Sequence, residues 1–150
     1  MPVEPSLVNV LVGDRNWSVE AVLDQDALLA GVVDDEQLAA FPYGLILWPA
    51  ASALASWLDN DRSWLIGKRI LEIGCGIGLA GLVAASHGAT VVQTDWQPAV
   101  LELAAKAAER NGVENIERRL GDWRSWPDDL PGFDAVIASD IFYERSLHDD

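Results

Sequence analysis

The sequence has 150 residues, of which 50% are hydrophobic and 23% are charged. This balance is typical of a single folded domain and excludes a disordered chain. The formal net charge of -14 disfavours direct binding to nucleic acid and attracts cationic partners. The lone cysteine, Cys75, allows no internal disulfide and favours a reducing cytoplasm, and we expect neither a secretion signal nor a membrane-spanning helix.

Residues 1–40 are predicted to form an N-terminal accessory segment, ahead of a domain that comprises residues 41–150. Turn residues between two apolar runs indicate a pair of strands, and Asp24 and Asp34 are typical helix caps. The expected elements are strands at 7–12 and 17–23 around a turn at 13–16, a short helix at 25–30, and another from about 34 to 41.

Residues 41–150 carry the pattern of an α/β domain. Pro49 suits the first turn of a helix that continues over 50–58. Strands are then predicted at 69–73, 89–94, 115–120 and 133–139, with helices at 77–87 and 98–110 between the first three of them. The continuous apolar run at 133–139 is typical of a parallel strand buried on both faces. This order predicts a Rossmann-like, doubly wound, mostly parallel sheet.

A glycine-rich turn follows the first of these sheet strands, with Gly74, Gly76 and Gly78 at alternate positions. Glycines there let backbone N–H groups and a helix N-terminus approach a ligand, although such a turn can also serve only to tighten strand–helix packing. About 20 residues later, Asp95 ends the second strand, where a carboxylate accepts hydrogen bonds from ribose hydroxyls. Its alternative role is to cap the helix that begins at Pro98.

Two adenosine-containing cofactors fit this pattern. Residues 76–81 satisfy G-x-G-x-x-G, which also marks nicotinamide dinucleotide sites of oxidoreductases. Glu72, however, lies two residues before Gly74, where its carboxylate would oppose a pyrophosphate but could hold the ammonium of a methionine moiety, directly or through water. The charge of Glu72 therefore favours S-adenosylmethionine (SAM).

Two further strand ends carry polar and aromatic side chains. Asp122 and Trp123 follow the third strand, where they suit an adenine amino group and ring; the alternative for Trp123 is a loop aromatic that covers the sheet edge. Asp140 and Tyr143 follow the fourth strand, where they could hold a substrate amine or, alternatively, cap and pack a following helix. One cysteine and two scattered histidines give no metal-ligand spacing and no nucleophilic triad.

Together these motifs resemble those of class I SAM-dependent methyltransferases, within them the branch of non-histone protein lysine methyltransferases and nicotinamide N-methylase-like proteins. The motifs are Gly-Leu-Ile-Leu-Trp-Pro-Ala-Ala at 44–51, Leu-Glu-Ile-Gly-Cys-Gly-Ile-Gly at 71–78, Gly-Asp-Trp at 121–123, and Asp-x-x-Tyr at 140–143. The resemblance implies a SAM site lined by Trp48, Gly74, Cys75, Gly76, Asp95, Trp123 and Ser139. It places Asp140 and Tyr143 beside the cofactor and the incoming nitrogen, with Asp140 orienting the amine.

The resemblance implies a seven-stranded sheet, whereas the sequence reaches Asp150 just after the fourth predicted sheet strand. We therefore expect a domain without the C-terminal strands and an uncovered sheet edge open to self-association. The leading hypothesis is a SAM-dependent N-methyltransferase acting on a protein lysine or a small amine. A non-catalytic SAM-binding module and, third, a nicotinamide-dependent oxidoreductase remain the alternatives.

Overall fold

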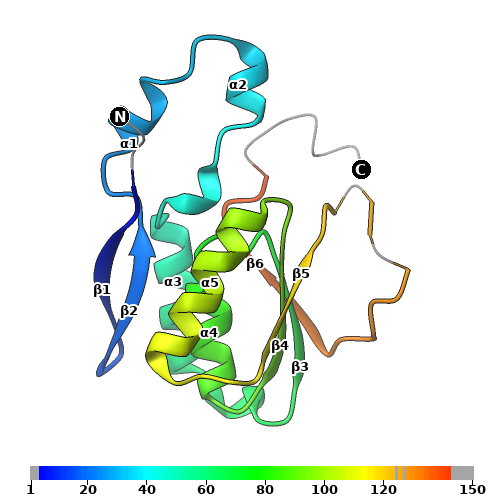
Figure 1. Cartoon of the computed structure of the whole chain (residues 1–150). Coiled ribbons are helices and arrows are strands. Elements are labelled where there is room, and N and C mark those ends of the chain that lie inside the picture. The colour runs from blue at the N-terminus through cyan, green and yellow to red at the C-terminus, as the bar shows by residue number, and fades with distance from the viewer. Residues whose placement is uncertain (1–3, 124, 127, 143–150) are drawn as a thin grey trace.

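The computed structural model describes residues 4–123, 125–126 and 128–142, and Figure 1 shows how its helices and strands are arranged. In chain order the elements are β1 (Ser6–Val12), β2 (Arg15–Ala21), α1 (Gln25–Leu29), α2 (Asp35–Ala39), the 3-10 turn η1 (Tyr43–Leu45), α3 (Pro49–Asn60), the 3-10 turn η2 (Arg62–Leu65), β3 (Arg69–Ile73), α4 (Leu79–Ser86), β4 (Thr90–Asp95), α5 (Pro98–Asn111), β5 (Ile116–Leu120) and β6 (Ala135–Ala138). The elements predicted between residues 69 and 120 are all present, with ends shifted by one or two residues at most.

The central sheet is parallel and has the strand order β5-β4-β3-β6. The predicted α/β, Rossmann-like fold class is therefore confirmed. Because the strands are parallel, their carboxyl ends meet at one edge of the sheet. This brings together three predicted site residues that are far apart in sequence, namely Gly74 after β3, Asp95 at the end of β4 and Ser139 after β6.

Three helices, α3, α4 and α5, lie side by side against the sheet (Figure 1). Residues 79–85 of α4 are all buried, because this helix is apolar on every side and is packed between its neighbours and β4. Helix α5 buries a single stripe, as its helical spacing predicts; the buried residues are Val100, Leu103, Ala104, Ala107 and Ala108. None of the helices in the described part of the chain has the length and apolar character needed to cross a bilayer.

The first two strands form the predicted antiparallel hairpin, and it packs on the same core as the sheet. Trp17 and Val19 of β2 are buried in one cluster with Leu82 of α4 and Val91 of β4. Each large apolar side chain buried in this cluster contributes roughly 2 kcal/mol. The hairpin is thus an integral part of the hydrophobic core.

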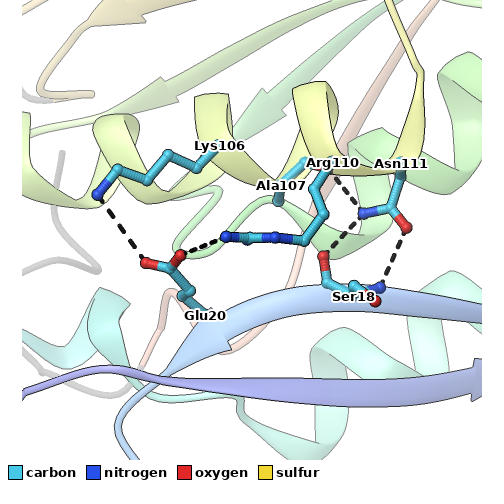
Figure 2. Close-up of polar contacts among 6 residues, drawn as sticks. All are labelled: Ser18, Glu20, Lys106, Ala107, Arg110 and Asn111. Carbon is cyan, nitrogen blue, oxygen red and sulfur yellow. Dashed lines mark hydrogen bonds and ion pairs between the residues drawn. The ribbon is translucent and has the colours of Figure 1, made fainter.

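Polar contacts fix the hairpin to α5 (Figure 2). The side-chain amide of Asn111 accepts from the backbone N–H of Ser18 (3.0 Å) and donates to its carbonyl (2.8 Å), so it pairs with β2 as a neighbouring strand would. Glu20 forms ion pairs with Arg110 (2.7 Å) and Lys106 (3.9 Å). These contacts set the position of the hairpin along the helix.

The last strand differs from its prediction. β6 spans only Ala135–Ala138, and of these residues only Ile137 is buried, while the Val136 side chain is 57% exposed. The prediction of burial on both faces is therefore wrong. The reason is that β6 pairs only with β3 at the edge of the described sheet and that no described helix packs extensively on its faces.

Candidate functional site

A cleft lies at the carboxyl ends of β3, β4 and β6. It is closed on one side by the segment between α2 and α3. Its walls consist of Tyr43, Gly44, Ile46, Trp48, Ala51, Gly74, Cys75, Gly76, Ile77, Asp95, Trp96, Trp123, Ser139, Asp140 and Ile141. The position agrees with the rule that ligands of open α/β sheets bind outside the carboxyl ends of the strands.

The glycine-rich turn forms the floor of the cleft. Gly74, Gly76 and Gly78 have φ values of 58°, 53° and 81°, which side chains other than glycine rarely tolerate. A Cβ at Gly74 would also lie 2.8 Å from Ile141, and a Cβ at Gly76 would lie 3.3 Å from the Gly44 carbonyl. The glycines are thus required both by the backbone conformation and by the close approach of the opposite walls.

The end of β4 is hydrogen-bonded to this turn. The Thr94 carbonyl accepts from the Cys75 N–H (2.9 Å), and its hydroxyl donates to the Glu72 carbonyl (2.9 Å). One oxygen of Asp95, Oδ2, accepts from the Gly76 N–H (3.1 Å). The turn is therefore held in one conformation by the neighbouring strand.

Asp95 lines the ligand cleft and also caps the start of α5, which are the two roles considered from the sequence. It lines the cleft, and its Oδ1 accepts from the Gln97 N–H (3.1 Å) just ahead of α5. Burial raises the pKa of this carboxyl, while the hydrogen bonds from the Gln97, Gly76 and Trp96 backbone lower it. A carboxylate offers about four lone-pair sites, so each oxygen retains capacity for a ligand hydroxyl.

Aromatic side chains from the segment before α3 form a second wall. Trp48 is the residue before α3, and its Nε1 donates to the Tyr43 carbonyl (2.9 Å). The rings of Tyr43 and Trp48 are 6.4 Å apart, and that of Phe41 is 4.5 Å from Tyr43. Trp48 was predicted to line the site, whereas Tyr43 was missed, although its place just ahead of the 44–51 motif was a usable signal.

At the mouth of the cleft, Asp140 follows β6. Its φ is 53°, and among the described residues it is the only non-glycine residue with a positive φ. This conformation costs an L-residue roughly 1–2 kcal/mol. Strain of this kind concentrates at functional sites, where the surrounding structure maintains it.

Cys75 also lines the cleft, and its side chain is a protonated thiol. Burial, helped by the negative charges of Glu72 and Asp95, raises its pKa well above the usual value. A protonated thiol is a poor nucleophile. Cys75 is therefore a lining residue of the turn and not a nucleophile.

Glu72, which was expected to hold the ammonium of a methionine moiety directly or through water, does not line the cleft. Its side chain is only 4% exposed and lies beneath α4, where Oε2 accepts from the Gly81 N–H (3.1 Å) and from Gln93 Nε2 (2.8 Å). Burial raises the pKa of Glu72 to about 7, against the lowering effect of these two hydrogen bonds. The physical reason for its placement is strand alternation, which points Glu72 toward the helices and not toward the strand ends.

Most other predicted residues are brought together. Trp123, Ser139 and Asp140 lie in the cleft wall with the glycine turn, whereas Asp122 lies outside the lining and bridges to Ser125. Tyr143 lies outside the described residues. The lining residues that sequence reasoning missed are Tyr43, Gly44, Ile46, Ala51, Ile77, Trp96 and Ile141.

The charge of the lining is distinctive. Two carboxylates, those of Asp95 and Asp140, belong to it, and among the described residues no Lys, Arg or His side chain does. Recognition of phosphate relies on cations or on several convergent N–H groups. This wall is better suited to a ligand that carries positive charge.

Comparisons with known proteins agree with this geometry. A family model described as lysine methyltransferase matches residues 33–150. Histone-arginine methyltransferase METTL23 of Xenopus laevis is 36% identical over 113 residues, which are 72% of this chain and 48% of that protein. Protein N-lysine methyltransferase METTL21A of Danio rerio is 34% identical over 103 residues, which are 65% of this chain and 47% of that protein. The chain thus spans about half the length of these relatives.

A solved structure shares the fold at low sequence identity. The T. thermophilus 16S rRNA N2 G1207 methyltransferase (RsmC), in complex with AdoMet and guanosine, superposes with a TM-score of 0.66 at 20% identity. The match covers 95% of this chain and 34% of that one. It supports the architecture of the sheet and its helices.

Proposed function

The chain belongs to the lysine methyltransferase family, a branch of the class I methyltransferases that depend on SAM, and on this premise we propose that it transfers a methyl group from SAM to a nitrogen of a protein lysine or a small amine. The observation that carries the proposal is the cleft, whose described lining residues include two carboxylates and no cationic side chain. Such a wall suits a sulfonium cofactor and a basic acceptor. The match of residues 33–150 to the lysine methyltransferase family disfavours the oxidoreductase alternative.

The residues of the cleft fit SAM by their chemistry. Asp95 has free lone pairs for the ribose hydroxyls, and Trp48 and Trp123 offer apolar surfaces for the adenine. The backbone of the turn at Gly74 and Gly76 leaves room for close approach of a ligand. SAM, when bound, supplies a methyl group on a positively charged sulfur.

Asp140 is the residue that we propose to orient the acceptor. Its carboxylate stands at the exposed mouth of the cleft, where it can accept a hydrogen bond from an amine N–H and direct the nitrogen lone pair inward. It also stabilises the positive charge that the amine nitrogen gains on methylation. We propose Tyr143 as its partner on the basis of sequence alone.

The acceptor class is inferred from charge and from the relatives. The names of two relatives describe methylation of protein lysine and of histone arginine, which supports a side-chain nitrogen of a protein. The net charge of -14 supports a basic acceptor and disfavours direct nucleic-acid binding.

Transfer is tested with radiolabelled SAM, a histone mixture, a cell extract and a small primary amine as acceptors. We expect label in at least one acceptor, and we expect Asp140→Asn to reduce transfer about a hundredfold without changing SAM affinity, as is typical for loss of a proton-handling or orienting group. Asp128→Asn, which alters an exposed carboxylate outside the cleft, is the matched control. SAM binding without transfer to any acceptor would favour the non-catalytic module, and a folded chain that binds no SAM would refute both.

Two further proposals concern the setting of the molecule. The exposed edge of β6, with Val136 on its surface, supports self-association through strand pairing. A concentration-dependent mass in analytical ultracentrifugation, reduced by Val136→Lys, would support it, and a concentration-independent monomer would refute it.

The single, buried cysteine is consistent with residence in a reducing cytoplasm.

A further inference from the structure

A row of polar side chains crosses the sheet beneath the helices, next to the cleft but not in it. Glu72 of β3, Gln93 of β4 and Arg118 of β5 are paired in register, so their side chains lie on one face of the sheet. Glu72 is 4% exposed and Gln93 is 1% exposed. Polar groups buried this deeply are costly unless they are hydrogen-bonded, so their partners define what the row does.

The hydrogen-bond partners of the row lie at the start of α4, which follows the glycine turn, and in α5, which follows β4. Gln93 Nε2 donates to Glu72 Oε2 (2.8 Å) and to the Gly78 carbonyl (2.9 Å). Glu72 Oε2 also accepts from the Gly81 N–H in the first turn of α4 (3.1 Å). At the other end of the row, the Arg118 guanidinium donates to the Ala104 carbonyl of α5 (3.1 Å).

Gly78 connects the row to the glycine turn, whose residues 74–77 line the cleft. It is the last residue of the glycine turn and the N-cap of α4. Its N–H donates to the Cys75 carbonyl (2.9 Å), which closes the turn, and its carbonyl accepts from the Leu82 N–H (3.0 Å), which starts the helix. A side chain that holds the Gly78 carbonyl therefore holds the turn and the helix together.

Two glycines of this region, Gly78 and Gly81, leave the space that the buried side chains of the row occupy. A Cβ at Gly78 would lie 2.7 Å from Gln93 Nε2, and a Cβ at Gly81 would collide with the Glu72 carboxylate. Gly78 and Gly81 fall within the G-x-G-x-x-G pattern that suggested close approach of a ligand. In this structure both make room for buried side chains.

Glu72 determines how the Gln93 amide is oriented. Both Nε2 hydrogens of Gln93 have acceptors, while its Oε1 is buried without a hydrogen-bond partner among the described residues. A flipped amide would set Oε1 against the carboxylate and the Gly78 carbonyl, which are both acceptors. The observed orientation is thus the one that gives Gly78 a donor.

We propose that Gln93, oriented by Glu72, is a positioning residue that fixes the glycine turn for cofactor binding through the Gly78 carbonyl. The inference rests on the proposed SAM site, because it concerns how that site is held. Gln93 does not line the cleft, so its effect on a ligand passes through the backbone of residues 75–78.

A double variant in which the two side chains are exchanged, here called the reversed pair, distinguishes the positioning role of Gln93 from simple stabilisation of the sheet. The double variant Glu72→Gln with Gln93→Glu keeps the volume, the burial and a hydrogen bond between the two strands. Once the side chain at position 93 is ionised, the variant lacks the donor to the Gly78 carbonyl, because a carboxylate can only accept. Binding is therefore compared at about pH 9, since burial raises the pKa of a carboxyl. Glu72→Gln alone retains an acceptor oxygen for Gly81 and Gln93 and is the matched control.

SAM affinity is measured by calorimetry on the full chain, with thermal unfolding as a check of the fold. We expect the reversed pair and Gln93→Met to weaken SAM binding about tenfold, a typical cost of one lost buried hydrogen bond. We expect Glu72→Gln to change it by less than about threefold. A reversed pair that folds and binds SAM like the unmodified chain would overturn the proposal, whereas an unmodified chain that binds no SAM would instead refute the proposed function.

A measurement on the unmodified chain covers the case in which the variants do not fold. The Gln93 side-chain amide protons are followed by NMR during a titration with SAM. We expect them to exchange slowly with solvent and to shift together with the backbone amides of the turn, since they share the Gly78 carbonyl. Turn amides that shift while the Gln93 amide signals stay fixed would contradict the proposal.

Discussion

The cofactor side of the cleft, which consists of the turn at 74–78 and the end of β4, is held differently from the acceptor side, which consists of residues 139–141 after β6. On the cofactor side, Gln93, Thr94 and Asp95 each hydrogen-bond to the turn or to the residues flanking it. On the acceptor side, Asp140 is exposed and strained at the end of an edge strand. The comparison indicates that the cofactor site is preorganised by buried contacts, while the acceptor site depends on a short and weakly covered element.

The largest expected effect tests the rigidity of the cofactor side. Gly78→Ala places a Cβ 2.7 Å from Gln93 Nε2 and 2.9 Å from the Ala104 side chain, at a φ of 81°. We expect a loss of about 4 kcal/mol in the free energy of unfolding, from strain and overpacking together. Gly112→Ala is the control, because its φ of 67° is similar but no atom lies within 4 Å, so only about 1 kcal/mol should be lost. Equal losses in urea unfolding would contradict the account of Gly78.

The next effect is a pH dependence that originates at Glu72. Burial raises its pKa in the folded chain from 4.5 to about 7, so between these values the folded state holds a proton that the unfolded state has lost. Stability from this group is thus complete below pH 4.5 and declines as the pH rises toward 7. Relative to Glu72→Gln, the unmodified chain should lose about 3 kcal/mol across this window.

Urea unfolding of both proteins at several pH values measures this difference, and the effects of groups that do not interact with Glu72 cancel in the comparison. Asp95 and Arg118 act on Glu72 in opposite directions, the first raising and the second lowering its pKa. A difference between the two proteins that stays constant from pH 4 to 8 would show that Glu72 does not titrate in this range.

The smallest expected effect has the opposite sign and belongs to the acceptor side. Asp140→Gly removes the strain of a positive φ of 53° and should stabilise the chain by about 1 kcal/mol, while methyl transfer is lost. Asp140→Ala removes the same carboxylate but keeps the strain, so it isolates the conformational effect. A glycine variant that is less stable than the alanine variant would contradict the assignment of strain to Asp140.

Much of the site could be predicted from the sequence, because parallel strands bring their carboxyl ends together. Alternating glycines after one strand and Asp95 after the next were sufficient to place the turn, and the motif residues Trp48, Trp123 and Asp140 lie in the same cleft. These predictions depend on local patterns and on one topological rule.

What could not be predicted depends on how elements pack on one another. Glu72 was assigned by its charge and its distance from Gly74, but its direction is set by strand alternation and by the space that Gly81 leaves. The exposure of β6 follows from its place at the edge of the sheet, which an apolar run does not reveal. The Tyr43 carbonyl accepts from Trp48 Nε1, and this contact between the two wall residues could not be read from the position of Tyr43 ahead of the 44–51 motif.

The central claim is that the cleft at the carboxyl ends of β3, β4 and β6 is a SAM site. Calorimetric titration of the unmodified chain with SAM, and separately with oxidised nicotinamide dinucleotide, tests it most directly. The account predicts saturable binding of one SAM per chain, weakened by Asp95→Asn, and no detectable binding of the dinucleotide. Binding of the dinucleotide, or the absence of SAM binding by the folded chain, would contradict it.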